Sequence, residues 1–138
     1  MNLSRLALAA LGGFGAYFFV GGVTSAIPAL RAEFSKYSTI YRPQQAMMGV
    51  MPAGMAAMFV SMIALAAIYA MLYKAGYGLA EGARFGALIG VFAIGAFVFH
   101  NYVNLRIGLA LTIQQAVAYF VAWTATGAVI GLIYRVPA

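Results

Sequence analysis

The sequence predicts an all-α polytopic membrane protein, in which four transmembrane helices form an antiparallel bundle and a short amphipathic helix lies between the first and the second. Three observations lead to this prediction. Hydrophobic residues make up 65% of the chain and charged residues only 7%, against about 25% charged residues in soluble domains. Four long stretches contain no charged residue. Glycines recur at four-residue spacing, which is typical of membrane helices in close contact.

Length, cysteine content and charge exclude several classes of protein. A chain of 138 residues is too short to bury this much apolar surface inside a water-soluble fold. Cysteine is absent, which excludes disulfides and thiolate chemistry. The net charge of +6 comes from basic residues at predicted helix ends and in loops. Those positions favour lipid headgroups as partners, so we expect the lipid bilayer and no nucleic acid.

The first predicted helix covers residues 6–26. Arg5 precedes an apolar run that continues past Gly22 through weakly polar residues. A basic start before an apolar core is also the pattern of a signal peptide, but the longer run favours a retained helix. The helix carries a patch of small residues, formed by Gly12, Gly13 and Gly15.

The segment 27–45 is too polar to be a span. Its apolar residues recur at helical spacing and its charged residues occupy other positions, which predicts a short amphipathic helix at the membrane surface. A helix that binds a protein partner is the alternative. The apolar set is Ile27, Leu30, Phe34 and Tyr37, and the charged set is Arg31, Glu33 and Lys36.

The second predicted helix covers residues 47–73 and carries one stripe of methionines, which is formed by Met48, Met51, Met55, Met58 and Met62. Methionine fills irregular contacts between helices, so packing is the first interpretation. Thioethers also bind Cu(I), which makes Met51, Met55 and Met58 weak candidate ligands. An apolar ligand groove is the third interpretation. No His, Cys or acidic residue accompanies the stripe, and we predict no cofactor. Residues 75–78 predict a short turn.

The third predicted helix, residues 82–103, has Gly82, Gly86 and Gly90 on one face. This small-xxx-small pattern allows the backbone of another helix to approach closely. The fourth, residues 108–134, carries a second such pair, Gly127 and Gly131. We therefore predict that these five glycines pack helices together.

A polar cluster is predicted where the third helix turns into the fourth. Folding the two helices back on each other brings His100 level with Thr112 and close to Gln115. The candidate residues are His100, Asn101, Thr112, Gln114, Gln115 and Tyr119. One hypothesis is that they cap helix ends at a wet interface; the others are a proton relay or cofactor site at His100 and a substrate contact. No span contains a carboxylate, which weakens proton-coupled transport.

Several short motifs resemble those of a group of small bacterial four-helix membrane proteins of unknown function, over about residues 40–135. The motifs are Arg42-Pro43, Met51-Pro52, Glu81-Gly82-Ala83-Arg84-Phe85-Gly86, Tyr102-Val103, Gln114-Gln115 and Tyr134-Arg135. The resemblance implies a bacterial inner-membrane protein with four helices. It implies no activity and no catalytic residue.

Charge and composition lead to several hypotheses about orientation and function. Four basic residues fall on each predicted side of the membrane, so charge does not decide the topology, and Arg5 before the first span favours cytoplasmic termini. We expect one membrane domain over residues 1–138, acting as a non-enzymatic subunit or accessory protein that associates with itself or with other membrane subunits. The alternatives are a homo-oligomeric transporter or channel with a polar path along the fourth helix, and a redox or lipid-linked component that uses His100.

Overall fold

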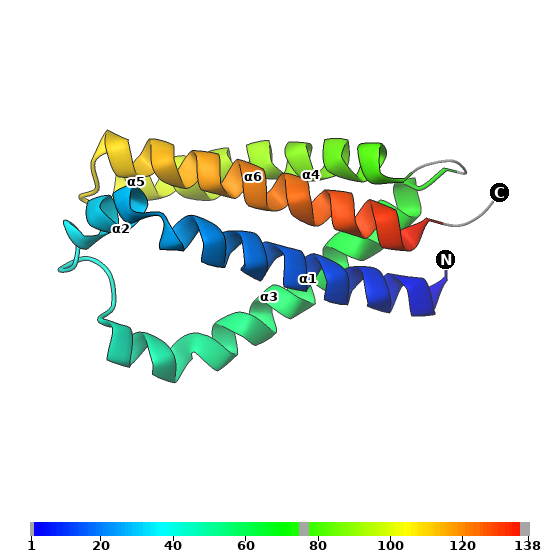
Figure 1. Cartoon of the computed structure of the whole chain (residues 1–138), viewed down its shortest axis with the longest axis horizontal. Coiled ribbons are helices and arrows are strands. Elements are labelled where there is room, and N and C mark those ends of the chain that lie inside the picture. The colour runs from blue at the N-terminus through cyan, green and yellow to red at the C-terminus, as the bar shows by residue number, and fades with distance from the viewer. Residues whose placement is uncertain (1, 75–77, 136–138) are drawn as a thin grey trace.

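The computed structural model describes residues 2–74 and 78–135, and every regular element within them is helical (Figure 1). The elements are α1 (Leu3–Ala26), α2 (Pro28–Ser35), α3 (Gln44–Leu72), α4 (Leu79–Ala93), the π-helix η1 (Ile94–Phe99), α5 (His100–Asn104) and α6 (Leu109–Tyr134). Within these residues, four helical stretches are long and apolar enough to cross a membrane: α1, α3, Leu79–Asn104 and α6. The prediction of four long apolar helices is confirmed.

Three of the long helices begin earlier than predicted, and local chemistry explains two of these starts. α1 starts at Leu3 because the Asn2 side chain accepts a hydrogen bond from the Arg5 backbone N–H at 3.1 Å, which caps the helix. α3 starts at Gln44, directly after Pro43, since a residue that precedes proline is kept out of helical geometry. In the segment 27–45 the α-helix α2 ends at Ser35. The turn predicted at residues 75–78 lies, apart from Gly78, outside the described residues.

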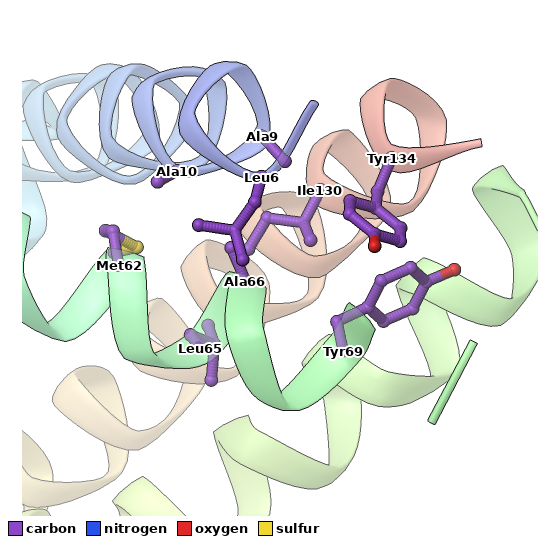
Figure 2. Close-up of a cluster of buried hydrophobic side chains, with 9 residues drawn as sticks. All are labelled: Leu6, Ala9, Ala10, Met62, Leu65, Ala66, Tyr69, Ile130 and Tyr134. Carbon is purple, nitrogen blue, oxygen red and sulfur yellow. The ribbon is translucent and has the colours of Figure 1, made fainter. Parts of the chain in front are cut away.

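Three helices meet in an apolar core near the end of the molecule where α1 begins and α6 ends (Figures 1 and 2). The backbone N–H of Asn2 donates to the Tyr134 hydroxyl at 3.3 Å, which ties those two helix ends together. Small residues on α1 and α3 allow the close approach. The buried set is Leu6, Ala9, Ala10, Met62, Leu65, Ala66, Tyr69, Ile130 and Tyr134.

The two halves of α3 differ in their surroundings. The second half contributes Met62 and Tyr69 to the core, whereas every residue from 42 to 57 is exposed. Figure 1 shows the reason: α3 leaves the other helices and diverges from α1 toward its own N-terminal end.

A π-helix interrupts the third long stretch, which the sequence analysis treated as one continuous helix. One extra residue in a helical turn rotates everything that follows by about 100°. The buried positions of this stretch show the shift, because Gly90 and Ala93 are followed by Val98, at 2% exposure, instead of Phe97, at 55%. His100 directly follows the π-helix, and its side chain is exposed.

Candidate functional site

The glycines of α4 and α6 bring the backbones of these two helices into direct contact. A Cβ atom on Gly86 would overlap the carbonyl oxygen of Trp123 and lie 2.9 Å from the Cα atom of Gly127. A Cβ atom on Gly82 would overlap the carbonyl oxygen of Gly127 and lie 2.8 Å from the Cα atom of Gly131. Backbone therefore meets backbone, and neither position has room for any side chain.

The same close approach is seen from the α6 side, and the space between the two backbones increases along the helices toward Gly90. From the α6 side, a Cβ atom on Gly127 would lie 2.5 Å from the Cα atom of Gly86, and one on Gly131 would lie 2.7 Å from that of Gly82. At Gly90 the nearest atom, the Cα of Phe120, lies at 3.3 Å, so the space is slightly larger there. The structure thus places all five predicted glycines in one contact, in opposite order along the two helices. We name these five residues the glycine contact.

The contact between α1 and α6 also uses glycines, but side chains oppose them. A Cβ atom on Gly12 would overlap the Cδ1 methyl group of Ile133, and one on Gly13 would lie 3.0 Å from Cγ1 of Ile130. Methyl groups at the end of a side chain can move aside, whereas a helix backbone cannot. This second contact should therefore tolerate an added methyl group better than the glycine contact; we call it the softer contact.

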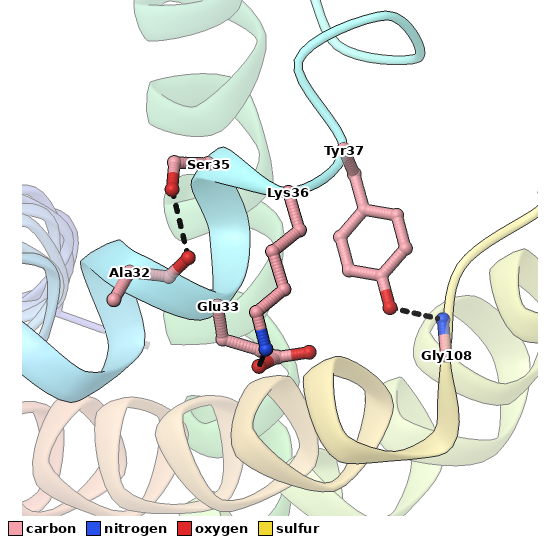
Figure 3. Close-up of polar contacts among 6 residues, drawn as sticks. All are labelled: Ala32, Glu33, Ser35, Lys36, Tyr37 and Gly108. Atoms are coloured by element: carbon pink, nitrogen blue, oxygen red, sulfur yellow. Dashed lines mark hydrogen bonds and ion pairs between the residues drawn. The ribbon is translucent and has the colours of Figure 1, made fainter.

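A polar contact holds the segment after α2 against the start of α6. The backbone N–H of Gly108 donates to the Tyr37 hydroxyl at 2.9 Å (Figure 3). This N–H lies at the start of α6, where backbone donors have no partner inside the helix. Figure 3 also shows the ion pair between Lys36 and Glu33 at the end of α2. The hydrogen bond to Glu33 and its negative charge raise the pKa of the Lys36 amine.

The structure does not bring the predicted polar residues into one cluster. His100 and Asn101 are exposed. Gln115 points to a different element, and its Nε2 donates to the Tyr41 hydroxyl at 3.3 Å, while the Tyr41 ring stacks on Phe34. Among the described residues, no hydrogen bond joins His100 to a side chain of α6.

The three remaining predicted members of that cluster, Thr112, Gln114 and Tyr119, have separate surroundings. Thr112 is fully buried and its hydroxyl donates to the Gly108 carbonyl oxygen at 3.1 Å. Tyr119 faces Tyr17 of α1. The Oε1 atom of Gln114 is buried without a hydrogen-bond partner among the described residues. Thr112 and Tyr119 thus make contacts within the bundle, whereas the Gln114 Oε1 atom makes no hydrogen bond among the described residues.

The methionine stripe runs from the core to the surface. Met62 is fully buried and Met58 is partly buried, whereas Met55, Met51 and Met48 are 41%, 43% and 62% exposed. Within the described ranges, no group of three or more His, Cys, Asp or Glu residues is placed to hold a metal ion.

Sequence reasoning missed the two tyrosines whose hydroxyls hydrogen-bond to the first half of α6 and its N-cap, Tyr37 and Tyr41. The signal for Tyr37 was its place in the apolar periodicity of residues 27–45, but that pattern does not reveal the helix that the side chain reaches. Comparison of the chain with protein-family models, with curated proteins and with solved structures finds no match.

Proposed function

We propose that this chain is a non-enzymatic integral protein of a bacterial inner membrane, a subunit or accessory factor whose four long helices cross the bilayer as an antiparallel bundle. In this arrangement α2 lies at the membrane surface and both termini lie in the cytoplasm. The partners are further copies of the chain or other membrane subunits.

The distribution of charge supports crossing of the membrane. Residues 6–26, 44–72, 85–105 and 107–134 contain no Asp, Glu, Lys or Arg. The four long helices are 24 to 29 residues in length, and about 20 residues are enough to cross about 30 Å of hydrocarbon.

The surface of these helices supports the same proposal. Large apolar side chains point outward along them, and soluble monomers rarely expose contiguous apolar surface on this scale. On α4 and α6 such exposed residues include Leu88, Val91, Phe92, Val117 and Leu132. A lipid environment accommodates this surface without cost.

The glycine contact is the observation that supports a packing role best. In lipid, apolar helices gain nothing by leaving a similarly apolar solvent, so association depends on close van der Waals packing. Only glycine at Gly86 and Gly127 allows the two backbones to meet at the observed separation. We infer that this contact holds the bundle in the form that a partner recognises.

A substitution at the glycine contact tests the proposal. Gly86→Leu and Gly90→Leu should disrupt folding or assembly, whereas Gly54→Leu should not, because a Cβ atom at Gly54 meets nothing within 4 Å. The measurements are extraction from membranes, oligomer size in detergent, and co-purification of neighbouring proteins. Native oligomer size and stability in both α4 variants would show that the packing role is wrong, and a chain that dissolves without detergent would refute the membrane assignment.

A further inference from the structure

The uncovered part of the methionine stripe faces the second half of α1. Met58 and Met62 pack into the core that α1 shares, and the rings of Phe14 and Phe59 join the two helices at a centroid distance of 5.7 Å. Residues three and four apart share one helix face. Met55, Met51 and Met48 therefore continue the α1-facing side of α3, beyond the point where the helices separate.

The facing wall of α1 is also uncovered. Phe18, Gly21 and Ser25 follow Phe14 at helical spacing and thus lie on the same side of α1. Phe18 is 41% exposed, and a Cβ atom on Gly21 would meet nothing within 4 Å. Residues 44–57 of α3 are all exposed as well, so both walls of the space between the diverging helices lie open. We call this space the α1–α3 opening, bounded by Phe18, Gly21, Met48, Met51 and Met55.

The length of the opening matches one leaflet of a bilayer. Residues 44–57 of an α-helix rise about 21 Å, and one leaflet contributes about 15 Å of hydrocarbon and its headgroup region several more. The other half of α3 is closed by its packing against α1 and α6. The opening therefore extends from one membrane surface to about the middle of the bilayer.

The wide end of the opening carries a basic residue, Arg42, and α2 with its C-cap carries two more. Arg42 is exposed and lies two residues before α3 begins, and Arg31 and Lys36 are exposed on and just after α2. Glu33 offsets the charge of Lys36 through their ion pair. Residues 36–43 contain no acidic residue, so this end of the opening carries a net positive charge.

We propose that the α1–α3 opening is a binding site for an anionic phospholipid of the leaflet on the α2 side. Its phosphate lies against Arg42, and an acyl chain lies along Met48, Met51 and Met55. The flexible thioether side chains adapt to a flexible chain. A helix of a second copy fits less well, because it would cross both leaflets whereas the opening ends halfway.

This inference rests on the proposed membrane location, and single-cysteine labelling tests both separately. The chain has no cysteine, so Met51→Cys and Leu88→Cys each provide one site for a fluorophore. Leu88 is 71% exposed on α4 and serves as the control position. The labelled proteins are placed in phosphatidylcholine vesicles with a minor fraction of phosphatidylglycerol. The acyl chains of one lipid or the other are brominated, and bromine quenches a nearby fluorophore.

Brominated phosphatidylcholine should quench the fluorophore at both positions. If it quenches neither, the membrane location itself is refuted. Brominated phosphatidylglycerol should quench position 51 about fivefold more than position 88, a preference of the size that one basic residue at a membrane surface provides. Arg42→Gln should remove this preference, whereas Arg84→Gln, at the opposite end, should leave it. Equal quenching by phosphatidylglycerol at both positions would overturn the lipid site alone. A disulfide between two copies of the Met51→Cys variant, with no quenching at position 51, would overturn it in favour of a second copy.

Discussion

The pairs α4–α6 and α1–α3 are built from equally apolar helices and differ in how closely they meet. α4 and α6 lie together along their length and touch through backbone at Gly86 and Gly127. α1 and α3 touch only through their halves near Met62 and then separate. Apolar character is common to both pairs, so it does not explain the difference. In lipid, the shape of the facing surfaces decides whether two helices stay together.

The first prediction compares three glycines, and it carries the largest expected effect. Gly86→Ala should destabilise the protein by about 3 kcal/mol, because the new methyl group meets the backbone of α6 and overpacking of this kind costs up to that amount. Gly90→Ala should cost clearly less, since its nearest neighbour lies at 3.3 Å. Gly54→Ala, in open space, should cost nothing. Thermal unfolding in detergent gives the order, and equal effects at Gly86 and Gly54 would contradict the account.

The second prediction compares the two ends of the methionine stripe. Met62→Ala should destabilise by about 2 kcal/mol, at the low end of the range for buried methionines, because lipid removes most of the transfer contribution. Met51→Ala should have almost no effect on stability, since that side chain is 43% exposed. Unfolding of both variants under one set of conditions tests this. A loss at Met51 as large as that at Met62 would mean that the stripe is covered throughout.

The third prediction concerns the softer contact of α1 with α6. Gly12→Ala should cost about 1 kcal/mol, because the Cδ1 methyl group of Ile133 has to move. Ile133→Val removes that methyl group and should recover most of the loss in the double variant. A double-mutant cycle measures the coupling, which lies between about 0.5 and 3 kcal/mol for residues in contact. Strict additivity would indicate that the two residues do not touch.

The fourth prediction, with an effect no larger than that of the third, concerns the hydrogen bond between Tyr37 and Gly108. Tyr37→Phe removes the hydroxyl that accepts the Gly108 N–H and should cost about 1 kcal/mol, the usual net value of one hydrogen bond. Tyr102→Phe, at an exposed tyrosine of α5 at the same end, is the matched control and should be neutral. If both variants unfold at the same temperature as the unchanged protein, the segment after α2 contributes nothing to the stability of α6.

The sequence allowed the glycine faces to be predicted, but neither the helix that each face meets nor the opening between α1 and α3. Four-residue spacing identifies Gly82, Gly86 and Gly90 as one face of a helix, and a face without side chains has few uses other than close approach. The methionines carry no such information, because Met62 in the core and Met48 at the surface follow the same spacing. Their environments depend on the direction of α3 relative to α1, which no local pattern encodes.

The predicted polar site failed to assemble for two physical reasons. The π-helix at Ile94–Phe99 adds one residue to a turn, so His100 no longer lies on the face that a continuous α-helix would give it. Hydropathy does not detect a single extra residue. Gln115 instead meets Tyr41, which is 74 positions away in sequence. A contact this distant depends on how the segment after α2 folds back, and sequence spacing does not reveal it.

The most direct test of the central claim is disulfide formation across the two helix pairs. The variant Gly90→Cys with Phe120→Cys should form an intramolecular disulfide under mild oxidation. The two backbones lie close enough there for the Cβ separation of about 4 Å that a disulfide needs. The variant Gly21→Cys with Met51→Cys, across the α1–α3 opening, should remain reduced within each chain under the same conditions. Oxidation of the second pair as readily as the first, or failure of the first pair to oxidise, would contradict the account.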